Sequence, residues 1–224
     1  MNYLQSTIDY VLNAENWTGA MGLGALMTQH VGYSLLGVGL SALIGVPLGW
    51  WVGHTGKGRG LAVVVSGAVR ALPTLGLITL FGLALGIGLL APLLALIILA
   101  LPSVLAGAYT GVESADPIAV DAARAAGMSE FQVLARVEIP LGAPLLVGGL
   151  RSAGLQVIAT ATLAAYTGAG GLGRLMFLGL KTQDYVMMLA SSLLVIALAL
   201  VSEAFFTLLQ RVVRPVGVRD RKAP

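Results

Sequence analysis

The chain has no cysteine, few charges and few aromatic side chains. Charged residues make up 10% and aromatic residues 6% of its 224 residues, whereas about a quarter of the residues in an average soluble domain are charged. The absence of cysteine excludes disulfides and thiolate metal sites. His30 and His54 each lack a second ligand at metal-binding spacing. We therefore expect no metal site and assign both histidines structural or surface roles.

Hydrophobic residues, by contrast, make up 57% of the chain and gather in five long segments. The segments cover approximately residues 31–52, 61–85, 87–112, 144–166 and 186–213. A helix that crosses a bilayer needs about 20 consecutive apolar residues, and a chain spans lipid only as helices or a closed barrel. The sequence therefore predicts an all-α integral membrane protein with about five transmembrane helices. The first thirty residues contain no Lys or Arg, which argues against a cleavable signal peptide.

Basic residues are distributed unevenly between the loops. One side of the predicted membrane holds Lys57, Arg59, Arg124, Arg136 and the basic C-terminal residues, and the other side holds only Arg174 and Lys181. Positive charge in short loops marks the cytoplasmic side, so we expect the N-terminus outside and the C-terminus in the cytoplasm. The predicted parts are an extracytoplasmic segment (1–30), a transmembrane domain (31–213) with a cytoplasmic insert (113–142), and a basic cytoplasmic tail (214–224).

The cytoplasmic insert carries clear helix start and stop signals. Asp116 is a good N-cap, and Gly127 suits a left-handed C-terminal cap. Ser129 and Gln132 form a capping box for a second helix, which Pro140 is expected to end. Two such short helices are marginal by themselves. They must pack on another protein, which the bare alanine surface of the first helix favours, or lie on the lipid headgroups.

The same insert resembles the EAA loop, EAA-x3-G-x9-I-x-L-P, of importer permeases in the ATP-binding-cassette superfamily. The match runs from Asp121-Ala122-Ala123 through Gly127 to Val137-Glu138-Ile139-Pro140, with intact spacing and three conservative replacements. The resemblance implies a MetI-like fold and a coupling helix that docks in a cleft of a cytoplasmic ATPase. It assigns ATPase coupling to seven residues: Asp121, Ala122, Ala123, Gly127, Val137, Ile139 and Pro140.

Three further segments narrow the resemblance. Residues 70–76, 101–111 and 160–173 are similar to the uptake permeases for glycine betaine, carnitine, choline and proline. The resemblance implies a compatible solute or quaternary amine as substrate and a multi-pass location in a bacterial inner membrane. The implied partners are a cytoplasmic ATPase dimer that binds ATP and Mg, a second copy of this or a similar permease, and an extracytoplasmic substrate-binding protein. No cofactor on this chain and no nucleic-acid partner are expected.

Other functions stay open on the sequence. A permease for methionine or another amino acid is the alternative among importers. An ion-coupled secondary transporter would show inverted repeats and midplane carboxylates, and Glu203 alone supports it poorly. A non-transporting scaffold would leave the spacing of the coupling loop without a purpose. We expect no enzyme, because no catalytic set shares a plausible site and the Gly168-x-Gly170-x-x-Gly173 motif lacks the strand that a dinucleotide fold requires.

Prolines, a charge and small hydroxyl side chains mark a candidate translocation pathway or gate. Its residues are Arg70, Pro73, Thr74, Pro102, Ser103, Thr160 and Thr162. A proline inside a span kinks the helix, either as a gate or as a simple bend. Arg70 either faces the bundle interior or snorkels to the cytoplasmic face, and Arg151 is expected to snorkel. Because aromatics for a cation–π cage are scarce, we expect most substrate selection in the separate binding protein.

Glycine is abundant, with 30 residues, many of them inside the apolar segments. Pairs four residues apart occur at Gly45/Gly49, Gly82/Gly86 and Gly107/Gly111. Small residues at this spacing let membrane helices approach closely. The pairs predict tight helix packing but do not name the partner helices.

Overall fold

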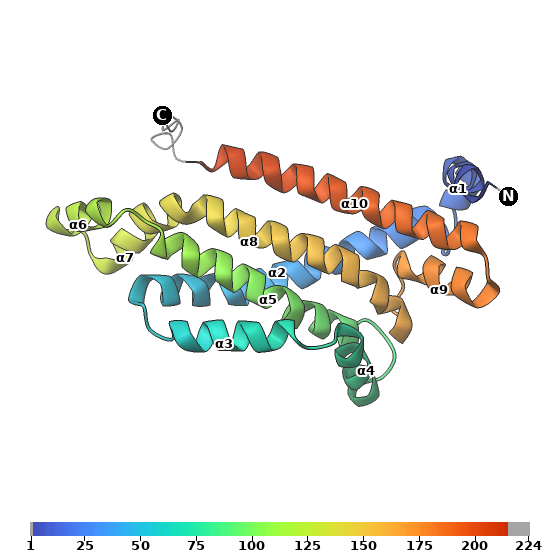
Figure 1. Cartoon of the computed structure of the whole chain (residues 1–224), viewed down its shortest axis with the longest axis horizontal. Helices are drawn as coiled ribbons and strands as arrows, with labels where there is room; N and C mark the ends of the chain where they lie inside the picture. The colour runs from blue at the N-terminus through green and yellow to red at the C-terminus, as the bar shows by residue number, and fades with distance from the viewer. Residues whose placement is uncertain (1, 215–224) are drawn as a thin grey trace. The chain divides into compact units, whose positions relative to one another are not determined.

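The computed structural model describes residues 2–214, and the regular elements in that range are all helical. The expected all-α class is confirmed (Figure 1). The predicted basic tail, apart from Arg214, lies outside the described residues.

Four helical stretches in the described part of the chain are long and apolar enough to cross a membrane. They are α2 (Leu23–Thr55), α5 (Leu90–Glu113), the run Glu130–Thr167 and α10 (Tyr185–Val212). The third run joins α7 (Glu130–Val133), the π-helical turn η2 (Leu134–Glu138), α8 (Ile139–Thr160) and η3 (Ala161–Thr167). A fifth span arises only if α3 (Arg59–Arg70) and α4 (Thr74–Leu85) count as one broken span.

The break between α3 and α4 corrects the prediction of one continuous, kinked span over residues 61–85. Helix α3 ends at Arg70, and α4 begins at Thr74 with Pro73 as its N-cap. Proline has no N–H to donate to the preceding turn, and it biases the residue before it away from helical geometry. Pro73 therefore separates two helices instead of bending one.

The shorter elements are α1 (Tyr3–Leu12), η1 (Ala14–Trp17), α6 (Pro117–Ala125) and α9 (Gly173–Thr182). Contacts divide the chain into two compact units. Unit 1 contains the described residues up to Gly39, then Ala71–Ala100 and Gly154–Ser202. Unit 2 contains Leu40–Arg70, Leu101–Ala153 and the described residues from Glu203 onward.

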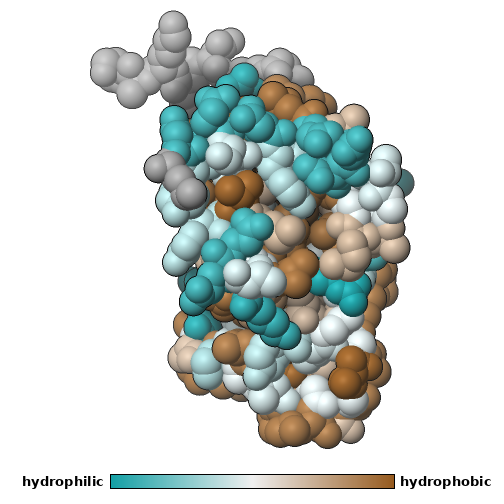
Figure 2. Space-filling model, turned by 90° about the vertical axis from the view of Figure 1, so that its right-hand side faces the viewer, coloured by the Kyte–Doolittle hydropathy of each residue, from teal (hydrophilic) through white to brown (hydrophobic). Residues whose placement is uncertain are grey.

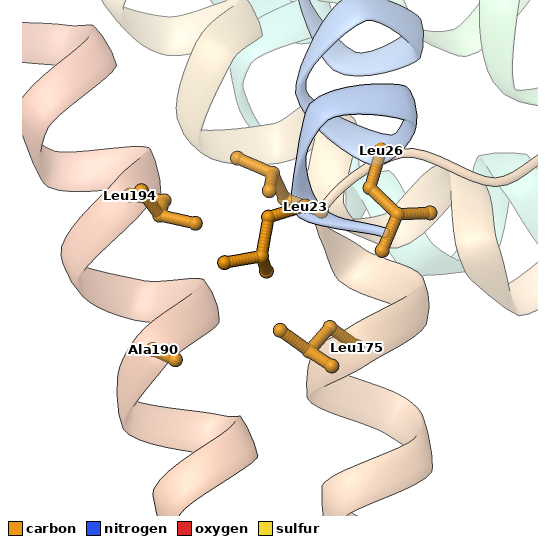
Figure 3. Close-up of a cluster of buried hydrophobic side chains, with 6 residues drawn as sticks. Leu23, Leu26, Leu175, Ala190 and Leu194 are labelled. Atoms are coloured by element: carbon orange, nitrogen blue, oxygen red, sulfur yellow. The ribbon is translucent and has the colours of Figure 1, made fainter. Parts of the chain in front are cut away.

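The core of unit 1 lies where α2, α9 and α10 meet. Leu23 and Leu26 of α2 pack against Leu175 of α9 and against Ala190 and Leu194 of α10 (Figure 3). Helix α9 lies between the predicted spans 144–166 and 186–213, where the sequence analysis predicted no helix. Leu175 of α9 is buried in this core, so tertiary packing stabilises a helix that is short for isolation.

Unit 2 is held together by glycine contacts between helices. In α5, a Cβ on Gly107 would lie 2.7 Å from the Cα of Gly149 in α8, and a Cβ on Gly111 would lie 2.7 Å from the carbonyl oxygen of Gly142. In α2, a Cβ on Gly45 would lie 3.1 Å from the side chain of Val104 in α5, and a Cβ on Gly49 would lie 2.8 Å from the carbonyl oxygen of Leu105. The two backbones of α5 and α8 therefore touch, and packing at the Gly45/Gly49 and Gly107/Gly111 pairs is confirmed with α5 and α8 as partners.

Helix α4 presents a hydrophobic surface. Leu80 and Leu83 of α4 are 60% and 84% exposed, and Ile87, two residues beyond the helix, is 91% exposed. Figure 2 views the end of the molecule at which α1, α4 and α9 lie in Figure 1, and hydrophobic residues line its lower edge, at the height of α4. Such a surface requires lipid or another apolar surface around it.

Candidate functional site

Helix α6 forms from the signals that its sequence carries. The Asp116 side chain accepts a hydrogen bond from the backbone N–H of Ile118 at 2.9 Å, and Pro117 occupies the first helical position. Gly127 follows the helix with φ +84°, the left-handed conformation that favours glycine. The predicted cap and the predicted C-terminal glycine are both confirmed.

The end of α6 is a Schellman motif that turns the chain into α7. The N–H of Met128 donates to the carbonyl of Ala123 at 3.2 Å, and that of Gly127 donates to the carbonyl of Arg124 at 2.9 Å. Both bonds of the predicted capping box, between Ser129 and Gln132, are then present at the start of α7. The two helices are therefore joined by a turn with a defined hydrogen-bond pattern.

Pro140 does not end the second helix, which corrects the prediction. Helix α8 runs through it, because the chain first widens into the π-helical turn η2. There the N–H of Ile139 donates to the carbonyl of Leu134, five residues back. A π turn relieves the clash that a proline ring would make with the carbonyl of the preceding turn. The insert is thus shorter than predicted, and its second helix is the start of a span.

The insert folds onto its own small hydrophobic core. Ala115, Val120, Ala123 and Val133 are buried together, and Met128, Val137 and Leu141 pack around them. Among the predicted coupling residues, Asp121, Ala122, Gly127 and Pro140 are exposed, Ala123 is buried, and Val137 and Ile139 are half-buried. The motif therefore divides into residues that a partner can touch and residues that shape the insert.

Two apolar side chains project from the insert into solvent. Ile118 of α6 and Phe131 of α7 are each 78% exposed. Exposed large side chains of this kind beside bare alanines make a surface suited to a protein partner. Sequence reasoning had credited the alanines and missed Ile118 and Phe131.

A chain of polar contacts joins α6 to the end of α2. His54, in the last turn of α2, has Nδ1 2.6 Å from Glu138 Oε2 and Nε2 3.3 Å from Glu130 Oε2. Arg124 of α6 donates to both oxygens of Glu130, at 3.1 and 3.0 Å. The hydrogen bond to Glu130 raises the pKa of Arg124 above its ordinary value. His54 and Glu138 have side chains only 13% and 8% exposed.

Sequence reasoning assigned His54 a structural or surface role and missed this chain of contacts. One signal could have revealed it. Glu138 is a carboxylate between the apolar residues Val137 and Ile139, and a carboxylate that becomes buried requires a partner. His54 lies at the same predicted membrane face and was an available partner.

Two further ion pairs involve residues that the sequence left unpaired. Arg59 pairs with Glu113 at the start of α3 and the end of α5. Arg151 of α8 donates from Nε to Glu203 Oε2 of α10 at 2.6 Å, and its Nη2 contacts the other oxygen. Such a pair stabilises a carboxylate in lipid-spanning helices, and the expected snorkelling of Arg151 stays a prediction.

The candidate pathway residues lie in both units. Arg70 ends α3 and is exposed, whereas Pro73 and Thr74 begin α4. Pro102 and Ser103 are buried in α5, where the carbonyl of Ser103 faces Gly149 of α8.

The two threonines of the candidate pathway are half-buried in unit 1. Thr160 donates to the carbonyl of Gln156 and Thr162 to that of Ala159, so both hydroxyls bond within their own helical segment. Their place in a pathway stays a prediction.

The glycine loop after η3 is tied to α2 and leads into α9. The N–H of Gly171 donates to the Gln29 side chain at 3.0 Å, and the Tyr33 hydroxyl donates to the carbonyl of Ala169 at 2.5 Å. No strand precedes it in the described residues. The same part of the chain contains no group of side chains that could hold a metal ion.

Comparison with known proteins shows which family and which relatives this chain is similar to. Residues 45–215 match the family described as binding-protein-dependent transport system inner membrane component. The osmoprotectant import permease protein OsmW of Salmonella typhimurium is 35% identical over 95% of this chain and 99% of its own length. The choline transport system permease protein OpuBB of Bacillus subtilis is 29% identical, covering 87% of this chain and 89% of its own.

Solved structures show the same fold. The MetNI methionine ABC transporter, in inward-facing conformations, contains a chain that matches with a TM-score of 0.75 and 19% identity. The match covers 86% of this chain and 96% of that chain. The expected MetI-like permease fold is confirmed.

Proposed function

The chain belongs to the family of binding-protein-dependent transport system inner membrane components, and from this premise we propose that it is the permease subunit of an ATP-driven importer for a compatible solute. The substrate class is a quaternary amine or related osmoprotectant such as glycine betaine, choline, carnitine or proline. The observation that carries the proposal is the similarity to OsmW along nearly the whole of both chains. The formed coupling insert supports the same function.

The insert is the part of the chain that a partner ATPase binds and moves. ATP and Mg bind to that partner, and this chain holds no cofactor. Asp121, Ala122 and Gly127 are exposed on one short helix and its turn, and Ile118 and Phe131 flank them as apolar anchors. A cleft on the ATPase that closes around α6 would move it as one body, because the insert has its own core.

The polar contacts beneath the insert support transmission of that movement. Arg124 travels with α6, Glu130 and Glu138 with the start of the third long run, and His54 with the end of α2. A displacement of α6 therefore acts through these contacts on two spans, α2 and the run Glu130–Thr167. This is a physical route from ATP binding to a change in access, as alternating access requires.

The assembly that completes the path contains further subunits. Four or five spans are too few to enclose a pathway, so a second copy of this or a similar permease, two ATPase subunits and an extracytoplasmic binding protein are part of the proposal. The expected orientation has the N-terminus outside, which puts α6 and its polar contacts in the cytoplasm with the ATPase.

Reconstituted uptake tests the proposal. Vesicles containing the permease, its ATPase and its binding protein should accumulate labelled glycine betaine or choline only when ATP is supplied to the ATPase side. Accumulation of methionine in preference to both would assign the runner-up substrate class. Uptake by the permease alone, driven by an ion gradient and without ATPase, would overturn the proposal.

A further inference from the structure

Helix α1 lies outside the residues matched by the family, which begin at residue 45. Figure 1 shows α1 nearly end-on beside the start of α10, which runs across the picture. The two helices touch through Tyr3 and Tyr185, whose ring centroids are 5.6 Å apart in an edge-on arrangement. Helix α1 therefore crosses the end of a candidate span instead of running along it.

Helix α1 has three distinct faces. Its inner face carries Thr7, which is fully buried, together with Tyr10 and Val11, which pack against the unit 1 core that includes Leu23 and Leu26. This core, shown in Figure 3, fixes the helix to the rest of unit 1.

The two outer faces of α1 differ in polarity. Leu4, Ile8 and Leu12 recur at every fourth position and are 59%, 40% and 76% exposed, so they form one apolar row. Gln5 and Asp9 form the next row, also exposed, and bond to each other at 3.3 Å. A helix with one side on protein, one apolar side and one polar side has the pattern expected at a boundary between lipid and water.

Aromatic side chains on and beside α1 are also typical of a boundary between lipid and water. Tyr3 and Tyr185 meet at the junction of α1 and α10, and Trp17 of η1 donates its ring N–H to the carbonyl of Val11 at 2.7 Å while 39% of it stays exposed. Tyrosine and tryptophan concentrate at membrane–water interfaces, where one end of the ring is apolar and the other is wet. Beyond Tyr185, the exposed residues Leu189, Leu193 and Ile196 continue down the span.

We propose that α1 is an interfacial helix that inserts Leu4, Ile8 and Leu12 into the headgroup boundary of the bilayer at the end of α10. The row of Leu4, Ile8 and Leu12 contacts lipid and not a protein partner. A stable protein interface buries about 800 Å² on each side and involves 20 or more residues, whereas α1 offers one row of three large apolar side chains. Between Tyr3 and Leu12 the helix carries Asp9 and no Lys or Arg, so it binds neutral lipid and gains nothing from anionic headgroups.

Single-cysteine spin labelling tests the proposal, because the natural chain has no cysteine and each introduced thiol is unique. The full chain, assembled with its ATPase, is reconstituted in phosphatidylcholine vesicles with a nitroxide at Ile8→Cys or, as the matched control, at the adjacent Asp9→Cys. We expect the ratio of oxygen to water-soluble nickel-chelate collisions to be several-fold higher at residue 8 than at residue 9. Adding the binding protein should not change this ratio.

Two outcomes of the spin-label experiment would overturn the proposal. Equal and high collision with nickel at both positions would place the apolar row in water. Low collision with both reagents at residue 8 would place it under protein, such as a second permease copy. A second measurement keeps the native helix and uses a Trp50→Phe/Trp51→Phe variant, in which Trp17 is the remaining tryptophan. Lipids brominated near the headgroup should quench Trp17 fluorescence more than lipids brominated near the bilayer centre. If neither lipid quenched it, the result would count equally against lipid contact.

Discussion

Replacing His54 with leucine should both destabilise the protein and uncouple it. The substitution leaves the Glu138 carboxylate, whose side chain is 8% exposed, without its 2.6 Å partner. Losing a hydrogen bond to a charged group costs about 1.5–3 kcal/mol, and leaving the buried carboxylate unpaired raises the cost toward about 3–5 kcal/mol. Taking the two ranges together, we expect a loss of about 2–4 kcal/mol.

Thermal melting of the detergent-solubilised permease measures this loss. For a chain of this size, each kcal/mol lowers the melting temperature by about 2–4 °C, so a loss of about 2–4 kcal/mol should make His54→Leu melt roughly 4–16 °C lower. The double variant His54→Leu/Glu138→Leu removes both polar groups and should recover most of the difference. Arg59→Gln breaks the more exposed pair with Glu113 and, as the control, should cost no more than about 1 kcal/mol.

The functional result separates a coupling role from a merely stabilising one. With His54→Leu, ATP hydrolysis by the assembled transporter should persist while the amount of substrate transported per ATP falls. If melting of His54→Leu matched the natural protein, or if the double variant melted no higher than the single one, the energetic reasoning would be wrong. If hydrolysis and transport fell in equal proportion, His54 would not lie on the coupling route.

Three further substitutions test other features of the structure. Gly111→Ala places a Cβ 2.7 Å from the carbonyl oxygen of Gly142 and should cost about 1–3 kcal/mol in melting assays, whereas Gly39→Ala, with no atom within 4 Å, should be neutral or stabilising by up to about 1 kcal/mol. Ala122→Arg, on the exposed side of α6, should abolish co-purification with the ATPase and leave the melting temperature unchanged. The neighbouring Ala123→Arg, in the buried cluster, should lower the melting temperature. Arg151→Glu should reduce the yield of folded protein, and the swap Arg151→Glu/Glu203→Arg should restore it if the pair stabilises α8 against α10.

The helix caps of the insert could be predicted because their determinants are local. An N-cap, a C-terminal glycine and a capping box act within four or five residues of chain, and Asp116, Gly127 and Ser129 do what their positions indicate. The helical class and four of the five predicted spans followed from run length in the same way. These properties depend on the composition and the hydrogen bonds of a short stretch of chain.

The features that sequence reasoning missed depend on distant partners. Arg151 and Glu203 are 52 residues apart, and His54 and Glu138 are 84 apart. Helix α9 is short, and its buried face meets a core built from α2 and α10. Averaged hydropathy also treats residues 61–85 as one apolar run and cannot separate a kink at Pro73 from a complete break. In each case the deciding contact is absent from the local sequence.

Pro140 is a local signal that was misread, and its true effect is to place a buried carboxylate. A proline normally marks a helix end, yet here the helix continues because η2 shifts the hydrogen-bond register by one residue, from the fourth to the fifth preceding carbonyl. That extra residue changes the direction in which the side chains of the turn project. Glu138, the last residue of η2, is buried and reaches His54 of α2. The proline therefore favours a wide turn in a continuous helix, and the wide turn positions the carboxylate that ties the start of the span to α2.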